Sequence, residues 1–466
     1  MKQNSYIRKI KLFKNIDLDK TLILDEQNQN YSKRQLIKLS QDIANIIKDK
    51  NLILFCCENT SENLAYYYAF IKNKQALILC ENNNELGHLI KKFNPEFIFL
   101  RKEKENVNNY YMIKEGINFK ILKNKKKIKK KIHKDLAILI TTSGSLKESK
   151  YVKLSYENIF ENAISISKYL KIKINDISIT TLPLSYSYGM SVCNSHLFFD
   201  KTIVCSKESF IERNFWEKVK KYRITNISFV PFNLETLNKL GLHKFDFSKI
   251  RFITLAGGKL NSSIVVNICN FFKSKKINFY SMYGQTEASP RISFIELKTL
   301  LKKPLSCGKA IPGGTITIDN KNKKKNYGEI VYKGKNIFKG YAQNRKDCYS
   351  LKNYYRLYTG DLGYKDINGD LFIIGRKKRE IKAYGVRINL DILENEINKK
   401  SSSFICTNSE NNLKIFYSKK NLNINKTSQT IRTLTNLRNK DIQFIYIKKF
   451  PRLKNNKINY KLLKNF

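Results

Sequence analysis

The chain has 466 residues, of which 42% are hydrophobic, so it can bury cores for two or three domains. The sequence lacks an uninterrupted apolar run of about 18 residues, which excludes a transmembrane helix. The N-terminus has scattered charges and lacks the apolar centre of a signal peptide, so we expect a cytoplasmic protein. The net charge of +49 allows an acidic partner, but the heavy use of lysine, asparagine and isoleucine is typical of an AT-rich coding sequence.

Cysteine and histidine usage argues against a metal centre built on these residues. The nine cysteines are scattered without a C-x-x-C pair, and the four histidines are dispersed. We therefore expect reduced cysteines that act as small buried hydrophobes. The densest basic run, Lys120 to Lys134, contains no aromatic residue that could stack on bases, and we interpret it as a solvated connector.

Apolar runs alternate with helical patterns through the first 283 residues. A helical pattern at Tyr31 to Lys50 comes first, a further helix is expected at 63–72, and the segment 89–93 leads to the strand at 97–100. Short, continuous apolar runs predict buried strands at 52–57, 76–80, 97–100, 136–140, 177–182, 202–205, 227–230, 252–256 and 278–283. This alternation predicts an α/β fold with parallel sheets that are covered by helices on both faces.

The second part of the chain changes character. Between Gly308 and Tyr341, short β runs separated by Gly, Pro and Asn predict a small β subdomain. The final elements are expected as a helix at 390–399, strands at 404–407 and 413–417, a helix at 428–437 and a strand at 442–447. We therefore predict a large domain over 1–377 and a small α+β domain over 378–466.

A predicted hairpin carries the first pair of functional candidates. Asn368-Gly369 between two apolar runs is a strong hairpin signal, because both turn positions need positive φ. Asp361 precedes the hairpin and Arg376 follows it. An acceptor-only carboxylate suits the two hydroxyls of a ribose, and an arginine can hold the sugar or a phosphate from the other side. An ordinary surface salt bridge is the alternative.

Three loops at the ends of predicted strands add candidates for nucleotide binding. The loop after the strand at 136–140 carries hydroxyls, a glycine and a cation that suit phosphate oxygens: Thr142, Ser143, Gly144, Ser145 and Lys150. At the end of the strand at 278–283, Tyr283 can stack on a purine, Thr286 can bond a phosphate and Glu287 can hold Mg²⁺. Gly257 lies in a turn where a flat base can approach the backbone.

These blocks, in this order, resemble the adenylate-forming superfamily of acyl-CoA synthetases, nonribosomal peptide adenylation domains and luciferases. The family phosphate loop TSG[ST]TGxPKG is matched by Thr142 to Tyr151, and YGxTE by Tyr283 to Glu287. The TGD block ends at Asp361, and GRxxxxIKxxGxRI is matched from Gly375 to Ile388. The family tail PxTxxGKxxR is matched at Pro451 and Lys457.

The resemblance implies a role for each matched residue. Tyr283 packs on adenine, Thr286 contacts the α-phosphate and Glu287 helps to bind Mg²⁺. Asp361 holds the ribose with help from Arg376. In the small domain, which acts as a mobile lid, Lys457 stabilises the transition state of adenylate formation, and Lys378 is the hinge about which the lid turns between two half-reactions. The implied reaction joins a carboxylic acid to ATP as acyl-AMP, releases pyrophosphate and passes the acyl group to a thiol.

The chain departs from the family pattern at several positions. Lys147 stands where the second glycine of the phosphate loop usually lies, Ser149 replaces the proline, and Tyr151 replaces the last glycine. Loss of glycines should stiffen this loop. In the tail, Asn456 replaces the glycine before Lys457, and asparagine is one of the few other residues that tolerate the left-handed conformation.

The stretch Leu182 to Gly189 resembles the block that lines the acid pocket, which gives four candidates: Tyr186, Tyr188, Gly189 and Asn194. No acidic residue occurs from Thr180 to Leu197, which argues against an α-amino acid, because a buried ammonium needs a carboxylate partner. Asn194 is compatible with a polar acid and equally with a core hydrogen bond. The acceptor thiol is expected on CoA or on the phosphopantetheine of an acidic carrier protein.

Other functions stay open at this stage. An enzyme that activates an amino acid and loads a free-standing carrier protein is one alternative. An inactive scaffold with the same fold is a second, although Glu287, Asp361, Arg376 and Lys457 are all retained. A nucleic-acid-binding protein would need basic clusters with aromatic residues or a binding module, and the sequence has neither, so we expect no nucleic-acid partner.

Overall fold

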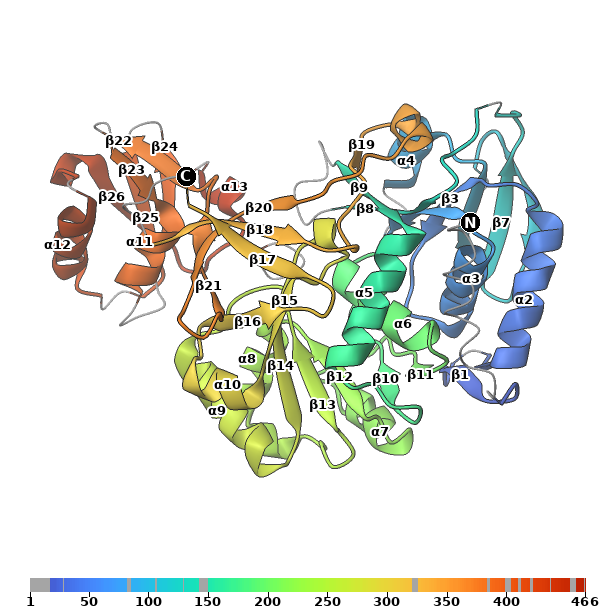
Figure 1. The fold of residues 1–466 in the computed structure, drawn as a ribbon, viewed down its shortest axis with the longest axis horizontal. Helices are drawn as coiled ribbons and strands as arrows, with labels where there is room; N and C mark the ends of the chain where they lie inside the picture. The colour runs from blue at the N-terminus through green and yellow to red at the C-terminus, as the bar shows by residue number, and fades with distance from the viewer. Residues whose placement is uncertain are drawn as a thin grey trace.

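The computed structural model describes residues 17–27, 29–81, 85–104, 107–128, 130–141, 150–320, 326–383, 386–398, 404–409, 412–419, 422–435, 437–452, 458–464 and 466. Two large sheets with helices between them make up most of the molecule, and the C-terminal elements form a separate lobe at the left of Figure 1. The described residues contain no helix that is long and apolar enough to cross a membrane.

Thirteen of the described strands form one sheet with a parallel centre. In spatial order they are β17 (Thr315–Asp319), β18 (Gly328–Lys333), β20 (Leu357–Lys365), β21 (Leu371–Arg376), β16 (Ser306–Ala310), β15 (Ser293–Glu296), β14 (Asn278–Tyr283), β13 (Phe252–Leu255), β12 (Asn226–Phe229), β10 (Ile177–Ile179), β11 (Thr202–Val204), β1 (Thr21–Leu24) and β2 (Tyr31–Ser32). The pairs from β1 to β14 are parallel, and those from β14 to β17 are antiparallel. The predicted small β subdomain is this antiparallel extension.

Eight further strands form the second sheet. Their order is β19 (Tyr341–Ala342), β9 (Tyr151–Ser155), β8 (Leu136–Thr141), β4 (Ala76–Cys80), β3 (Leu52–Cys56), β5 (Phe97–Arg101), β7 (Phe119–Asn124) and β6 (Tyr110–Glu115). The strands from β8 to β5 pair in parallel, and the outer strands pair antiparallel. Continuous apolar runs predicted the parallel strands, whereas the edge strands lacked that signal.

Helices cover both faces of the two sheets and create a shared core. α3 (Ser61–Lys72), α5 (Tyr156–Tyr169) and α6 (Ser187–Leu197) lie in the core between the sheets, with α2 (Lys33–Ile46) packed on α3. The other face of the larger sheet is covered by α7 (Arg213–Lys221), α8 (Pro231–Leu240), α9 (Ser262–Ser274) and α10 (Leu297–Lys302). α4 (Leu86–Phe93) and the short helix η5 (Arg345–Tyr349) cover the other face of the smaller sheet.

The C-terminal lobe has its own small core. Its elements are β22 (Glu380–Ala383), β23 (Val386–Asn389), α11 (Leu390–Ile397), β24 (Phe404–Ser409), β25 (Asn412–Tyr417), α12 (Ile424–Thr435), β26 (Ile442–Tyr446) and α13 (Tyr460–Lys464). These elements agree with the α+β composition predicted for this region. The backbone turns at Lys378, between β21 and β22, and the Lys378 side chain is exposed. The domain boundary and the hinge remain predictions.

The interpretation of Lys120 to Lys134 as a solvated connector is wrong for its first residues. Lys120 to Asn124 belong to β7, and Lys120 itself is buried, with its ammonium donating to the carbonyl of Lys104 at 2.7 Å. A lysine at alternate positions of a strand can bury its aliphatic stem, and the lysine-rich sequence concealed that pattern. The prediction for the cysteines is confirmed, because all nine are free and only Cys307 is partly exposed.

Candidate active site

The hairpin of β20 and β21 brings Asp361 and Arg376 together as the sequence predicted. The two residues are register partners across the strands, and Arg376 Nε lies 3.3 Å from Asp361 Oδ1. The turn lies where the sequence predicted it, but only Gly369 has a positive φ (+77°), whereas Asn368 does not. The Gly369 amide donates to the Asp366 carbonyl at 2.9 Å, so the turn starts at Asp366 and the prediction of positive φ at both Asn368 and Gly369 is wrong. Asp361 is 7% exposed, and its burial raises the pKa of the carboxyl, while the Arg376 charge opposes this shift. The hairpin therefore holds a buried carboxylate beside an exposed cation.

Tyr283 completes this group from the larger sheet. It ends β14, and its hydroxyl donates to Asp361 Oδ2 at 2.6 Å. Burial and the adjacent Asp361 charge both raise the pKa of the phenol, so Tyr283 stays a neutral donor. Each oxygen of Asp361 thus has one protein partner and retains lone pairs for another donor. Such a carboxylate suits the two hydroxyls of a ribose.

Thr286 and Glu287 follow Tyr283 in the short helix η4 (Thr286–Ala288). Thr286 Oγ1 lies 3.2 Å from Ser187 Oγ at the start of α6, and Tyr341 donates its hydroxyl to Glu287 Oε1 at 2.8 Å. In the described part of the chain, no lysine or arginine forms an ion pair with Glu287. A carboxylate with only a neutral partner fits Mg²⁺, which uses one or two protein carboxylates together with substrate phosphates.

Two glycines shape the loops around this group. Gly257 follows β13 at φ +101°, and a Cβ placed there would lie 2.9 Å from the Tyr186 hydroxyl. Gly284 has no room for any side chain, because a Cβ would lie 1.6 Å from the Pro290 carbonyl oxygen and 3.0 Å from Arg291 Cα. The chain from Gly284 to Arg291 therefore folds back tightly on itself.

The four residues predicted to line the acid pocket have different surroundings. Tyr186 lies half-buried beside Gly257, whereas Tyr188 is fully buried and shares a hydrogen bond of 2.8 Å with Thr254. A Cβ on Gly189 would lie 2.3 Å from the Pro183 carbonyl oxygen, so this glycine permits close packing. Asn194 accepts a hydrogen bond of 2.8 Å from Tyr67 on α3. Of the four, Tyr186 lies against the loop that also carries a nucleotide-binding candidate.

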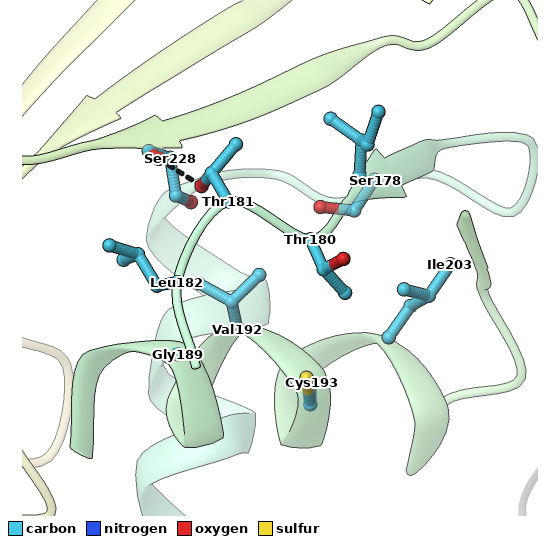
Figure 2. A pocket seen from close by; sticks show the side chains of 10 residues that line it. Ser178, Thr180, Thr181, Leu182, Gly189, Val192, Cys193, Ile203 and Ser228 are labelled. Atoms are coloured by element: carbon cyan, nitrogen blue, oxygen red, sulfur yellow. Dashed lines mark hydrogen bonds between the residues drawn. The ribbon is translucent and has the colours of Figure 1, made fainter. Parts of the chain in front are cut away.

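A small cavity lies between α6 and the strands β10, β11 and β12 (Figure 2). Its walls include Thr181, whose hydroxyl donates to the Ser228 carbonyl, together with Ser178, Val192 and Cys193. The cavity has room for about one water molecule, which is too small for an acid substrate.

Several predicted residues lie outside the described part of the chain. These are Thr142, Ser143, Gly144 and Ser145 of the phosphate loop, and Lys457 of the tail. Lys150, at the end of the same loop, is described and exposed. Tyr151, which replaces the last family glycine, is 3% exposed and packs edge-on against Phe93 at 5.2 Å between ring centroids. That departure from the family pattern therefore supplies core packing at the start of β9.

The structure also adds residues that the sequence did not single out. Lys259 donates to the Ile373 carbonyl at 2.7 Å and ties the loop after β13 to β21. Ser187 and Tyr341 contact Thr286 and Glu287, as described above. Arg291 lies against the segment at Gly284, and its guanidinium carbon is 4.5 Å from the centroid of the Tyr188 ring. Of these residues, only Ser187 lies within a block that resembles the family, Leu182 to Gly189. Lys259, Tyr341 and Arg291 carried no sequence signal.

The small C-terminal lobe is attached to β21 by several polar contacts. The Arg376 amide donates to Asp391 Oδ2 at 2.7 Å, and Asn389 donates to the Arg376 carbonyl at 2.7 Å. Arg379 binds both Asp391 and Glu394 and lies 3.8 Å from the centroid of the Tyr460 ring. Arg376 is thus shared, because its side chain contacts Asp361 while its backbone anchors the start of α11.

The family model of AMP-binding enzymes matches residues 16–342. The chain belongs to this family. Three relatives are 2-succinylbenzoate–CoA ligase of Oceanobacillus iheyensis (29% identity over 266 residues), oxalate–CoA ligase of Saccharomyces cerevisiae (29% over 266) and probable 4-coumarate–CoA ligase 3 of Dictyostelium discoideum (31% over 269). The matches cover 55–56% of this chain and 47–54% of the relatives. The chain thus spans about half the length of the curated relatives it matches.

Solved structures of the same fold align over nearly the whole chain. O-succinylbenzoate coenzyme A synthetase from Bacillus subtilis, in complex with AMP, has a TM-score of 0.74 at 20% identity and 98% coverage of both chains. NpsA from Klebsiella oxytoca, in complex with 3-hydroxyanthranilyl-AMSN, has a TM-score of 0.75 at 12% identity, with 98% of this chain and 97% of that chain covered. The predicted α/β fold class is confirmed.

Proposed function

We propose that the protein activates a carboxylic acid with ATP as acyl-AMP, releases pyrophosphate and transfers the acyl group to the thiol of CoA. The observation that carries this proposal is the shared binding of Asp361 by Tyr283 and Arg376. Three separate motifs of the adenylate-forming pattern thereby meet at one buried carboxylate. Membership of the AMP-binding family and the CoA ligases among its relatives support the same reaction.

Each residue of the site has a chemical task in this proposal. Asp361 accepts hydrogen bonds from the ribose hydroxyls, and Thr286 with Ser187 donates to the α-phosphate. Glu287 provides a carboxylate for Mg²⁺, which would neutralise charge on the phosphates. Lys457, together with the hydroxyl loop that starts at Thr142, would offset the charge that gathers as a carboxylate attacks the α-phosphate. A carboxylate is a poor electrophile, and the AMP leaving group makes the later thiol attack possible.

The second half-reaction requires the lid to move. We assign the hinge to Lys378, because it lies exposed in the turn between β21 and β22. Rotation there would move Lys457 away from the site and let the thiol enter, while Asp361 would stay in place on the hairpin. The CoA ligases among the relatives favour CoA as the acceptor. The phosphopantetheine arm of an acidic carrier protein is the second candidate, supported only by the net charge of +49.

An amino-acid substrate is disfavoured by the groups near Tyr186. The block from Thr180 to Leu197 contains no acid that could pair with an α-ammonium, and the buried charge beside Tyr188 is the cation of Arg291. An ammonium group beside that cation would be repelled. An inactive scaffold would retain ATP binding without turnover.

Acid-dependent ATP–pyrophosphate exchange tests the proposed function. We expect the wild-type chain to exchange label only when a suitable acid is present, and CoA to yield the thioester. Hydrolysis of ATP without exchange, or exchange that does not depend on any acid, would contradict adenylate formation. Replacing CoA by a phosphopantetheinylated carrier protein in the second step distinguishes the two acceptors.

A further inference from the structure

Arg291 is a buried cation that no acidic residue of the described chain neutralises. Its residue is 2% exposed, its Nε is enclosed without a hydrogen-bond partner, and no described carboxylate oxygen lies within 4.0 Å of it. Its guanidinium instead lies over the Tyr188 ring at 4.5 Å. The other largely buried arginines differ, because Arg251 pairs with Asp176, Arg345 with Glu96, and Arg379 with Asp391 and Glu394.

The groups around Arg291 are neutral phenols from α5 and from the start of α6. The Arg291 charge opposes the effect of burial on the pKa values of Tyr169, Tyr186 and Tyr188, which burial raises. The Tyr188 hydroxyl is already shared with Thr254, and the Tyr169 hydroxyl donates to Met282 Sδ at 2.9 Å. These phenols surround the cation but carry no negative charge. A face of aromatic rings stabilises a guanidinium only in part.

A buried arginine cannot escape this cost by losing its proton. Lys50 provides the contrast, since burial lowers the pKa of its ammonium to about 7, beside the neutral acceptors Leu136 and Tyr156. A guanidinium stays charged at any ordinary pH. An uncompensated buried charge strongly destabilises a protein. The charge of Arg291 therefore needs an anion that the described chain does not supply.

The position of Arg291 indicates where that anion would come from. Arg291 Cα is within 3.0 Å of a Cβ placed on Gly284, so the arginine lies directly behind the segment that carries Tyr283 and Thr286. Ser187, the contact of Thr286, stands in the chain between Tyr186 and Tyr188, and both of these tyrosines interact with Arg291. The reacting carboxylate must face the α-phosphate near Thr286 and Ser187. A group that extends from it along Tyr186 and Tyr188 would meet the guanidinium.

We propose that Arg291 binds a second carboxylate of the acid substrate, so that the enzyme activates a dicarboxylic acid. This assignment rests on the proposed function and names its substrate class. Arg291 is a specificity residue here, because it pairs with the carboxylate that does not react. Its planar guanidinium can hold that group through two parallel hydrogen bonds, and binding of the diacid removes the unpaired buried charge.

The test compares diacids with their monoamides, which keep the shape and remove one charge. The probes are succinate with succinamate, glutarate with glutaramate and phthalate with phthalamate, beside oxalate and malonate. In ATP–pyrophosphate exchange, we expect kcat/KM of the wild type for its best diacid to exceed that for the monoamide by at least about 30-fold. Arg291→Met should remove this preference, mainly through the KM for the diacid, without lowering exchange with the monoamide.

Two further variants keep the test decisive. Arg251→Met removes a matched arginine that also lies over an aromatic ring, Phe252 at 4.8 Å, but is already paired with Asp176, so the diacid preference should be unchanged. If Arg291→Met does not fold, the same exchange assay is carried out with Arg291→Lys. A single ammonium keeps the charge and loses the bidentate geometry, so we expect about 10-fold weaker diacid use with the preference retained.

A binding measurement separates failure of this inference from failure of the proposed function. The diacid should raise the melting temperature of the wild type and not that of Arg291→Met, even without ATP. If diacid binding depends on Arg291 but no acid supports exchange, the proposed reaction is wrong and the assignment of Arg291 holds. If monoamides support ATP–pyrophosphate exchange with the same kcat/KM as diacids, the assignment of Arg291 is overturned and the proposed reaction stands. If no diacid of the panel supports exchange or stabilises the wild type, the assignment is overturned.

Discussion

The candidate site has a nucleotide end around Asp361 and an acid end around Arg291. The buried charge is paired within the protein at the nucleotide end and, among the described residues, unpaired at the acid end. At the nucleotide end, the buried Asp361 is matched by Arg376 and by a donated hydrogen bond from Tyr283. At the acid end, Arg291 is buried among neutral phenols with no carboxylate beside it in the described chain. A ligand at the first end needs to bring only hydrogen-bond donors, such as ribose hydroxyls. A ligand at the second end has to bring a negative charge.

The largest effect is expected from Lys457, which is assigned to the transition state of adenylate formation. Lys457→Ala should lower the rate of acyl-AMP formation by at least about 100-fold, because a cation that offsets developing charge is lost. Thioester formation from supplied acyl-AMP should stay within a few-fold of wild type. Single-turnover assays of the two half-reactions measure this difference.

Lys448→Ala is the matched control for Lys457, because Lys448 is an exposed lysine of the same lobe. It should leave both half-reactions unchanged. Equal loss of both half-reactions in Lys457→Ala would contradict its assignment to adenylate formation.

The next effect tests the paired end. Asp361→Asn keeps the shape of the side chain but removes the charge that Arg376 and Tyr283 share, so we expect the KM for ATP to rise about 10- to 100-fold. The acid preference should stay the same, because Arg291 is untouched. Steady-state kinetics with ATP varied at saturating acid provide the measurement.

Asp366→Asn provides the control on the same hairpin, where Asp366 pairs with Lys303 at 2.5 Å in the turn. Surface pairs of this kind contribute little, so the KM for ATP should not change. A rise as large as that in Asp361→Asn would show that both substitutions act by disturbing the hairpin.

A third prediction concerns stability without ligand. Arg291→Met should keep or raise the melting temperature, because it replaces an unpaired buried cation by an apolar side chain. Arg251→Met should lower it by a few degrees, because it leaves Asp176 without its partner. Thermal unfolding of the two variants in the same buffer, without substrates, makes the comparison. A larger loss in Arg291→Met than in Arg251→Met would mean that Arg291 is satisfied within the protein.

The smallest expected effect is a pH dependence of stability that arises from the buried Lys50. A buried lysine can lose its proton, whereas a buried arginine such as Arg291 cannot. Burial lowers the pKa of Lys50 to about 7 from 10.5, so between these pH values the unfolded chain binds a proton that the folded chain has lost. Stability should therefore gain a component that rises with pH from about 7 to 10.5. Lys50→Met should remove that component, as measured by melting temperature at pH 7 and pH 9.5.

Lys48→Met tests whether the pH effect belongs to the buried site, because Lys48 is an exposed lysine two residues away. It should leave the pH dependence of the melting temperature intact. The same slope in Lys50→Met and in the wild type would contradict a folded-state pKa near 7 for Lys50.

The sequence predicted the parts of the site that depend on local patterns. Asn368-Gly369 located the hairpin, but a register shift between Leu362 and Gly363, which the sequence did not reveal, is what places Asp361 opposite Arg376. Continuous apolar runs located β14 and therefore the position of Tyr283 at its end. Local periodicity and turn chemistry act over a few residues, so they can be read without a structure.

The sequence could not reveal contacts between distant segments. Tyr283 and Asp361 are 78 residues apart, and Glu287 and Tyr341 are 54 apart, so their hydrogen bonds depend on the sheet topology. Arg291 was concealed for another reason. A single arginine in a chain with 88 lysines and arginines carries no signal of burial, and its interpretation depends on the absence of a carboxylate partner among the described residues. Lys120 was misread because of the same abundance of charge.

The most direct test of the whole account is acid-dependent ATP–pyrophosphate exchange by the wild-type chain, with the diacid and monoamide pairs as substrates and Lys457→Ala as control. We expect exchange with a diacid, weak exchange with its monoamide, and loss of both in the control. ATP binding without exchange for every acid would contradict the central claim that this site forms an acyl-adenylate.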